Sequence, residues 1–302
     1  MRILQLGPQF RPKTSHVYPP FKNGRYMEEY VYDYLIGKET PAFVAYNLRC
    51  DSVYIPIFWT NLQNHPGFLQ MKAAYNALLH SALLKEEQAM KDANVDKPSY
   101  FTIVQHDDGP QLDLPPHTII FGACTGTLPL PLIYEDVGNT LLYQPRIAKD
   151  ILASFVGSIT HPVRNAMLAA VDQHADIICY GKKEWSSHIS PDRSDQFIAI
   201  TLRSKFCLAP RGYGRSSFRF FEAMLLDVIP VYIWDDKCWL PYQDDINYDT
   251  FSVSIHVDQI VQLHDILLAI SDEKYEQMLI TMRRVRSMFS LEHMCKYIIR
   301  WI

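Results

Sequence analysis

KFCLAPRGYGRSSFRFFEAMLLDVIPVYIW, residues Lys205 to Trp234, is the stretch that decides the fold. The apolar run Phe206–Ala209 predicts a strand, and a proline and two glycines soon after it end that strand sharply. Two serines, which are favoured helix-capping residues, come before an apolar pattern with helical spacing. Ile229–Trp234 predicts a further strand. The stretch is therefore expected to form a strand, a glycine loop, a helix and a strand.

The loop in this stretch is suited to binding phosphate. A helix N-terminus beside a glycine loop offers unpaired backbone N–H groups and a partial positive charge. Arg211, Arg215 and Arg219 add guanidinium groups, which bind phosphate oxygens in a forked geometry. Arg219 and Glu222 are three residues apart and share one helix face, where arginine can bind phosphate and glutamate the hydroxyls of a ribose. A solvated Arg/Glu pair beside a tight turn is the alternative interpretation.

Composition limits the class of protein. The 302 residues are about twice the usual size of one domain, so two domains are expected. A net charge of −4 and a charged fraction of 21% argue against a protein that mainly binds nucleic acid. The six cysteines form no C-x-x-C pair, which argues against a zinc site or a disulfide framework. No stretch matches a signal peptide or a membrane span, so a soluble, cytoplasmic protein is expected.

The rest of the chain alternates strands and helices, which favours parallel sheets covered on both faces. The other expected strands are Arg2–Leu6, Ser52–Trp59, Tyr100–Gln105, Thr118–Gly122, Thr140–Tyr143, Ile151–Val156, Ala175–Tyr180 and Phe251–Ile255. The other expected helices are Met27–Leu35, Gln70–Met90, Val163–Val171, Asp192–Arg203, Val257–Ile270, Asp272–Ser287 and Leu291–Trp301. Because the pattern restarts near residue 150, we expect an N-terminal domain over residues 1–150 and a C-terminal domain over residues 151–302.

Several motifs, taken in order, resemble the exostosin-like family of inverting glycosyltransferases. The run FCLAPRGYGRSSFRFFEAM followed by IPV is similar to the family signature. Upstream, Asp51–Phe58 resembles the family's D-x-x-x-x-P-F strand, His106–Asp107 its H-D pair, and Phe155–Arg164 its F-x-G…R element. The resemblance covers residues from about 18 to 270. It departs at Asp227–Val228, where the family has glycine and cysteine, and this leaves the tightness of that turn open.

The resemblance implies a fold and a donor. The fold is α/β of the GT-B type, in which two Rossmann-like domains face each other across a cleft, with the acceptor on the N-terminal domain and the donor on the C-terminal one. In such folds the final helix, here residues 291–302, commonly crosses back to the N-terminal domain. The chain, without a membrane anchor, is similar to compact viral members, some of which transfer xylose. UDP-xylose is therefore the preferred donor among the UDP forms of xylose, glucuronic acid, N-acetylglucosamine and galactose.

The resemblance also implies roles for residues. The predicted donor site comprises Arg164, Pro210, Arg211, Gly212, Tyr213, Gly214, Ser216, Ser217, Arg219 and Glu222. Arginines and loop amides, Arg219 foremost, are expected to stabilise the departing diphosphate. A general base must deprotonate the acceptor hydroxyl, and Asp107 or Asp108 fits best at the end of a strand. His106 and His161 are the alternative bases, and a plain turn at Asp107–Asp108 is the alternative to a base there.

No metal and no permanently bound cofactor are expected. The acidic pairs Asp107–Asp108, Asp235–Asp236 and Asp244–Asp245 lack the D-x-D spacing of metal-dependent transferases. The expected partners are a UDP-sugar donor and an oligosaccharide or glycan acceptor, with no nucleic acid. Two other functions stay open, a binding subunit that holds a nucleotide sugar without turnover and, more weakly, an epimerase that needs no acceptor.

Overall fold

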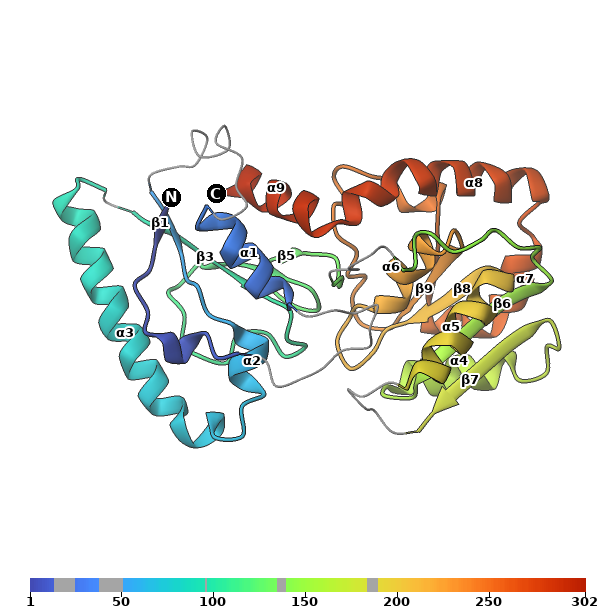
Figure 1. Ribbon diagram of the computed structural model, residues 1–302, viewed down its shortest axis with the longest axis horizontal. Coiled ribbons are helices and arrows are strands. Elements are labelled where there is room, and N and C mark those ends of the chain that lie inside the picture. Colours follow the sequence, from blue (N-terminus) through green and yellow to red (C-terminus); the bar gives the residue numbers. More distant parts are fainter. Residues whose placement is uncertain (14–24, 38–50, 96, 135–139, 184–189) are drawn as a thin grey trace. The chain divides into compact units, whose positions relative to one another are not determined.

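The computed structural model describes residues 1–13, 25–37, 51–95, 97–134, 140–183 and 190–302. The chain forms two α/β units (Figure 1). Of the described residues, unit 1 comprises residues 1–13, 25–130 and 291–302, and unit 2 comprises residues 131–290. The boundary therefore lies at residue 130 rather than 150, because Leu141 joins the core of unit 2.

Unit 1 contains a parallel sheet whose strands follow one another in sequence order. The strands are β1 (Arg2–Ile3), β2 (Ser52–Tyr54), β3 (Ser99–Val104), β4 (Ile119–Gly122) and β5 (Leu128–Pro129). Its helices are η1 (Pro8–Phe10), α1 (Met27–Leu35), α2 (Trp59–Gln63), α3 (Phe68–Asp92) and α9 (Leu291–Trp301). Among the described residues the strand order of this sheet does not reverse, so the described part of unit 1 lacks the reversal at which nucleotides bind in a Rossmann domain.

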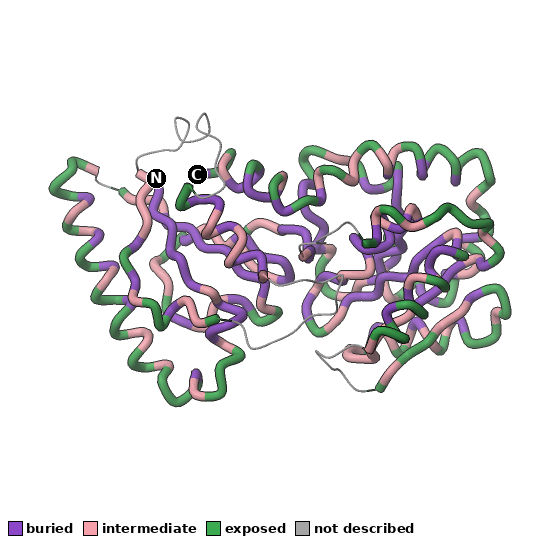
Figure 2. The backbone as a smooth tube through the Cα atoms, in the orientation of Figure 1, coloured by how far each residue is buried: buried purple, intermediate pink, exposed green. Residues whose placement is uncertain are grey.

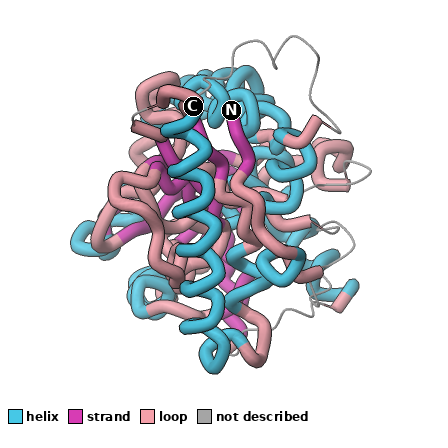
Figure 3. Tube along the Cα trace, turned by 90° about the vertical axis from the view of Figure 1, so that its left-hand side faces the viewer, coloured by secondary structure: helices cyan, strands magenta, loops and turns pink. Residues whose placement is uncertain are grey.

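Two helices cover unit 1 in different ways. Helix α3 lies along the outside of the unit (Figure 3), and its side chains Leu79 and Leu83 join the core with Val53 and Val104 of the sheet. Helix α9, from the end of the chain, contacts α1. No helix in the part of the chain that the structure describes is long and apolar enough to cross a membrane.

Unit 2 contains a second parallel sheet, whose strand order does reverse. Its order is β10 (Val253–His256), β9 (Ile229–Trp234), β8 (Ser204–Pro210), β6 (Ile151–Ser158) and β7 (Ile177–Lys182). The chain goes from β6 to β7 on one side and then returns to place β8 on the other side of β6. Ligands in open parallel sheets bind at such a reversal, beyond the carboxyl ends of the strands. In unit 2 this point lies between the ends of β6 and β8.

Helices flank the second sheet. They are α4 (Pro162–Val171), α5 (Pro191–Arg203), α6 (Phe218–Leu225), η3 (Tyr248–Thr250), η4 (Val257–Gln262), α7 (Leu263–Leu268), α8 (Asp272–Val285) and η5 (Arg286–Phe289). Helices α5 and α6 share a core with Val156 and Cys207 of the sheet, whereas α4 contacts η4 and α7. Figure 2 shows the central strands β2, β3, β8 and β9 mostly buried and the outer sides of α3 and α8 exposed.

Most predicted elements are confirmed, and one strand is wrong. Residues 140–143 form turns instead of the predicted strand. Leu141 is fully buried while Thr140 and Leu142 are not, so one side chain alone packs this run against the core. Among the described residues, no strand pairs with the run. The single helix predicted over Val257–Ile270 is divided into η4 and α7, which are six residues each.

Helix α6 ends in a turn that usually requires glycine. Asp227, just beyond the helix, has a φ of 60°, in the left-handed region. The N–H of Val228 bonds the carbonyl of Ala223 at 2.9 Å, and the N–H of Asp227 bonds that of Met224 at 3.3 Å, which is a Schellman motif. The Asp227 carboxylate accepts from Arg283 at 2.6 Å. The turn is therefore tight without glycine, and an ion pair offsets the cost of its backbone conformation.

Replacing Asp227 with asparagine tests this ion pair, because asparagine tolerates the left-handed backbone but carries no charge. Partial burial acts to raise the pKa of Asp227, but Arg283, with Arg146 and Arg286, outweighs it and holds the pKa below its usual range. A lowered folded pKa gives stability that is present at neutral pH and lost as pH falls through that pKa. We expect D227N to lower the free energy of unfolding by about 1–2 kcal/mol near neutral pH.

Urea unfolding at neutral pH and at about pH 3 measures this difference. The loss should shrink at the acidic pH, where the carboxylate of the unaltered protein is itself becoming neutral. A loss of equal size at both pH values would show that shape, not charge, makes Asp227 stabilising.

Candidate active site

The loop between β8 and α6 lies where the strand order of unit 2 reverses. Pro210 is the last residue of β8, and the N–H of Arg211 bonds a carbonyl of β9 at 2.9 Å. The loop then closes on itself, since the N–H of Gly212 bonds the carbonyl of Ser216 at 3.2 Å. A side chain at residue 212 would lie 3.2 Å from the guanidinium of Arg164, so glycine is favoured there. The predicted loop is thus placed at the crevice.

Arg164, on α4, joins the ends of two neighbouring strands. Its guanidinium donates to the carbonyl oxygens of Ser158 at 2.5 Å, Pro210 at 3.3 Å and Arg211 at 3.0 Å. Ser158 ends β6 and Pro210 ends β8, so the side chain spans the reversal in strand order. Arg164 thereby positions the loop, and its contact with phosphate stays a prediction.

Arg211 and Arg215 pair with carboxylates that follow β9. Arg211 donates to Asp235 at 2.6 Å and to Asp236 at 2.8 Å, and Arg215 donates to Asp236 at 2.7 Å. Partial burial acts to raise the pKa of Asp236, but its hydrogen bond to Arg215 and the charges of both arginines hold the pKa below its usual value. Hydrogen-bond donors of both arginines are therefore already paired with carboxylates.

Arg219 and Glu222 lie on one face of α6, as their spacing predicts, and both are turned into the protein. Arg219 donates to the carbonyl of Val156 at 2.7 Å, and its guanidinium lies 3.9 Å from the ring centroid of Phe197. Glu222 is 1% exposed, is ion-paired with Arg219, and accepts a hydrogen bond from the Tyr134 hydroxyl at 2.8 Å. The alternative of a solvated pair is therefore wrong.

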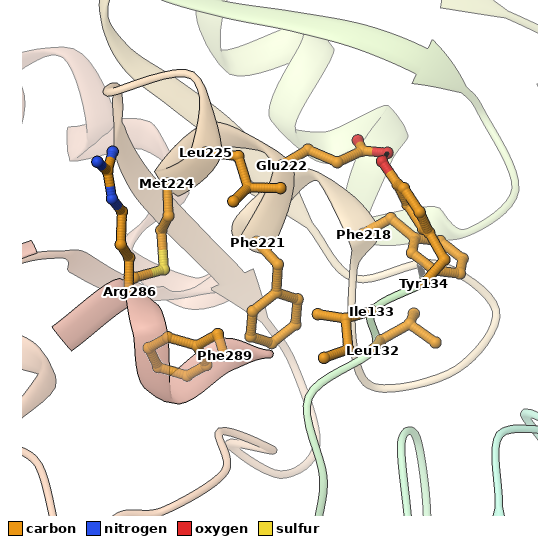
Figure 4. A pocket seen from close by; sticks show the side chains of 10 residues that line it. All are labelled: Leu132, Ile133, Tyr134, Phe218, Phe221, Glu222, Met224, Leu225, Arg286 and Phe289. Atoms are coloured by element: carbon orange, nitrogen blue, oxygen red, sulfur yellow. Dashed lines mark hydrogen bonds between the residues drawn. The ribbon is translucent and has the colours of Figure 1, made fainter. Parts of the chain in front are cut away.

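A mostly apolar pocket lies beside Glu222 (Figure 4). Figure 4 shows the Tyr134 hydroxyl and the Glu222 carboxylate directed at each other along one side, with the ring of Phe218 beside Tyr134 and the ring of Phe221 in the middle of the pocket. Arg286 borders the other side. Glu222 and Tyr134 thus form a polar edge of a mostly apolar pocket, which is an arrangement that can orient a ligand hydroxyl.

Ser216 and Ser217 are buried at the start of α6. Ser217 is the N-cap residue, but its hydroxyl accepts no hydrogen bond from the helix. Among the described residues, none pairs with the Ser217 hydroxyl, although the residue is only 3% exposed. A buried polar group in that state costs about 1–3 kcal/mol, which a ligand at the helix N-terminus would offset. Tyr213 at the tip of the loop is 61% exposed, and Gly214 beside it is buried.

The predicted base lies in an exposed turn after β3, in unit 1. The N–H of Gly109 bonds the carbonyl of His106 at 3.1 Å, and Gly109 has a φ of 74°. Asp107 and Asp108 are the exposed central residues of this turn. Burial lowers the pKa of His106, and the two aspartates oppose this shift. The turn itself is confirmed, and the role of either aspartate as base stays a prediction.

The alternative base His161 lies in unit 2, as the N-cap of α4. Its Nδ1 accepts from the N–H of Val163 at 3.4 Å, and its Nε2 lies 3.9 Å from Asp235. Burial lowers the pKa of His161, and the positive charge of Arg211 adds to this shift. A neutral imidazole is thereby favoured next to the loop.

Residues 117–270 match the family model of the exostosin GT47 domain. The chain belongs to the exostosin GT47 family. The matched segment of this GT47 chain runs from before β4 to beyond β10 and so includes the whole β8–α6 loop, Arg164 and the Arg219–Glu222 pair. The two parallel α/β units agree with the GT-B class predicted from the sequence, and the way in which the units face each other stays a prediction.

Curated relatives match the GT47 chain over part of their length. A probable glycosyltransferase of Arabidopsis thaliana is 33% identical over 173 residues, which are 55% of this chain and 34% of the relative. A probable glucuronosyltransferase of Oryza sativa subsp. japonica is 36% identical over 85 residues, 28% of this chain and 20% of the relative. The aligned part of this chain therefore spans about a third or less of these relatives.

Solved structures show a weaker likeness. The crystal structure of TarM is 9% identical, with a TM-score of 0.40 over 68% of this chain and 51% of TarM. The pneumococcal O-GlcNAc transferase GtfA, solved with UDP and GlcNAc, is 13% identical, with a TM-score of 0.37 over 68% of this chain and 44% of GtfA.

The GT47 chain also holds a buried acid that the sequence did not predict. Glu28, on α1 of unit 1, is fully buried, and its Oε1 accepts from the N–H of Gln105 at 2.8 Å and from the Thr60 hydroxyl at 2.7 Å. Its Oε2 has no partner among the described residues. Burial raises the pKa of Glu28 to about 7, against the effect of these hydrogen bonds. Glu28 thus holds the end of β3 directly before the His106 turn.

Glu28 and Tyr134 were missed because neither lies in a recognisable motif. Glu28 is one of two adjacent glutamates at the start of a helix, and acidic residues there are ordinary. Tyr134 follows an apolar run outside the strands and reaches Glu222 from 88 positions away in the sequence. Only packing reveals either contact.

Proposed function

We propose that this GT47 chain is an inverting glycosyltransferase that moves a sugar from a UDP-sugar to a hydroxyl of a glycan acceptor. The acceptor oxygen bonds to the anomeric carbon while the bond from that carbon to the diphosphate breaks. The hydroxyl proton passes to a general base, and UDP leaves with the bonding electrons. Membership of the exostosin GT47 family and the named glycosyltransferases among the relatives support this reaction class.

The observation that carries the proposal is the unpartnered Ser217 hydroxyl at the N-terminus of α6. It lies in the loop at the reversal of strand order, where nucleotides bind in open parallel sheets. A serine hydroxyl that donates a hydrogen bond and a helix N-terminus both stabilise the negative charge that develops on the leaving diphosphate. Arg219, two residues further along at the same end of the helix, is ion-paired with Glu222 in this structure and would supply positive charge to the diphosphate when the donor binds.

The remaining parts of the proposal concern the donor, the base and the metal. UDP-xylose is the first donor to test, and UDP-glucuronic acid the second, because rice relatives are named probable glucuronosyltransferases. Asp107 or Asp108 takes the acceptor proton. The chemistry needs no metal, because Ser217, Arg219 and loop amides stabilise the leaving group.

A binding subunit without turnover is the second candidate. The observation that favours it is the pairing of Arg211 and Arg215 with Asp235 and Asp236, which leaves their charges neutralised in this state. A protein of this kind would hold a nucleotide sugar for a catalytic partner.

Release of UDP distinguishes the two candidates. The protein is incubated with each UDP-sugar and a panel of glycan acceptors, with and without EDTA, and its melting temperature is measured with UDP. Acceptor-dependent UDP release that persists in EDTA is the expected result. A rise in melting temperature without turnover would favour the binding subunit, and activity lost in EDTA and restored by Mn²⁺ would show that a metal is needed.

Replacing Glu222 with glutamine tests its proposed contact with the ribose. The amide keeps the volume of the carboxylate but accepts hydrogen bonds less strongly, so UDP binding should weaken about tenfold. Titration calorimetry with UDP measures the change. Tyr134→Phe is the matched control, because it removes the hydroxyl that bonds Glu222 and leaves the carboxylate in place. Unchanged UDP affinity in E222Q would remove Glu222 from the donor site.

A further inference from the structure

A cluster of metal-ligating side chains lies at the opposite end of the sheet of unit 2 from the candidate active site. His174 and Asp176 are in the turn between α4 and β7, and His264 is in α7. One ligand atom from each residue lies within 4.8 Å of those from the other two. Asp176 directly precedes β7, so the cluster is at the amino ends of the strands, whereas the donor loop is at their carboxyl ends.

The three side chains already contact one another. The Nε2 of His264 lies 3.1 Å from both carboxylate oxygens of Asp176. The rings of His174 and His264 are stacked, with centroids 3.8 Å apart and planes 13° from parallel. The other nitrogen of His264, Nδ1, lies 3.9 Å from the carboxylate of Asp265. His264 is therefore between two carboxylates and against a second imidazole.

The backbone holds the ligands in place. The N–H of His174 bonds the carbonyl of Val171 at 3.0 Å, and the N–H of Ile177 bonds the carbonyl of His174 at 3.1 Å, which fixes the turn. The carbonyl of Asp176 accepts from the N–H of Leu152 in β6 at 2.9 Å. Helix α7 contacts α4, which ends next to this turn. Segments 88 residues apart thus present their ligands to each other on fixed elements.

We propose that His174, Asp176 and His264 bind one divalent transition-metal ion, with Zn²⁺ the best match. Two imidazole nitrogens and one carboxylate oxygen are ligands that Zn²⁺ shares with Co²⁺ and Ni²⁺, whereas Mg²⁺ and Ca²⁺ prefer oxygen alone. Water completes the coordination. The carboxylate of Asp265, 3.9 Å from the second nitrogen of His264, would accept a hydrogen bond from it once the ring turns, as carboxylates commonly do behind a metal-bound histidine.

Binding requires a small rearrangement of the two rings. A shared ion must lie in the plane of each imidazole, whereas the rings now lie face to face. The torsion that turns a histidine ring is soft, and the His264 side chain is 18% exposed while that of Asp176 is 44% exposed, so room for the movement is present. The ion then links α7 to the turn before β7. Its role is structural, and it does not depend on the proposed glycosyltransferase activity.

Titration of the metal-free protein with Zn²⁺ tests the proposal. We expect one saturable site by calorimetry and a rise in melting temperature of several degrees at saturation. Co²⁺ should give the visible absorption of a site with nitrogen and oxygen ligands. Addition of EDTA to the zinc-loaded protein should reverse the rise in melting temperature and leave sugar transfer unchanged.

Three variants locate the site. His174→Asn removes one ligand and leaves the hydrogen bonds between Asp176 and His264 in place, so it should abolish the saturable site. The Asp265 side chain is 89% exposed, so Asp265→Asn should leave the fold unchanged. This variant should weaken Zn²⁺ binding about tenfold or more. His80→Asn, at an exposed histidine on α3, should change nothing. Absence of saturable binding to the unaltered protein, or equal binding by His174→Asn, would overturn the proposal.

Discussion

Ser217→Ala is expected to lower kcat for sugar transfer by about tenfold or more without lowering the melting temperature. The hydroxyl is buried and has no partner among the described residues, so its removal deletes a polar group that burial penalises and should leave the fold unchanged or more stable. If the same hydroxyl donates to the departing diphosphate, that interaction strengthens as charge develops and its loss appears mainly in kcat. Activity and stability should therefore change in different directions.

Ser204→Ala is the matched control for this prediction. Ser204 is also fully buried, at the start of β8, but its hydroxyl is bonded to Ser154 at 2.8 Å and to the carbonyl of Ile200 at 2.9 Å. Its removal should cost about 1 kcal/mol of stability and leave kcat unchanged. Steady-state kinetics with the active donor, together with thermal unfolding, measures both variants. An unchanged kcat in Ser217→Ala would exclude Ser217 from the leaving-group site.

Glu28→Gln is expected to remove a pH dependence of stability. Burial raises the folded pKa of Glu28 to about 7 from 4.5, so folding takes up a proton between these values. The corresponding stability is complete below the unfolded pKa and is lost as pH rises through about 7, by a total on the order of 3 kcal/mol. Glutamine is neutral and has nearly the same shape, so the variant should be the more stable protein above pH 7 and nearly equal to the unaltered one at low pH.

Urea unfolding from about pH 4.5 to pH 8 measures this difference. Glu276→Gln is the control, because Glu276 is exposed on α8 and its replacement should leave the pH profile of the unaltered protein in place. Parallel pH profiles for Glu28→Gln and the unaltered protein would show that Glu28 is ionised in the folded state throughout this range.

The helices and strands were predicted well where the spacing of apolar residues was compatible with only one type of secondary structure. The bounds of α1, β9 and α9 agree with the prediction to the residue, because each has a clear period and clear flanks. Thr140–Tyr143 failed because a four-residue run of strand-forming residues is compatible with a strand, and only packing shows that Leu141 alone is buried. The boundary between the units was predicted at residue 150 instead of 130, because apolar spacing alone does not show that Leu141 packs in the core of unit 2.

For the candidate site, the sequence predicted which residues share the loop and not what they contact. The motif placed Arg211, Ser217 and Arg219 around one helix N-terminus, since that depends on local spacing. It did not predict that Asp235 would pair with Arg211, because this pairing comes from the parallel register of β8 and β9. Nor could spacing show that the Ser217 hydroxyl lacks a partner. Whether a side chain has a hydrogen-bond partner depends on residues that are distant in the sequence and close only in the folded structure.

The two units differ in how far apart in the sequence their parts lie. Unit 1 combines residues 25–130 with helix α9, from residues 291–302. The sheet of unit 2, by contrast, is formed entirely by residues 151–256. The contact between α1 and α9 therefore closes a loop of more than 250 residues, which contains the whole sheet of unit 2. A stop codon at position 291 would leave unit 2 intact and the apolar face of α1 without its cover.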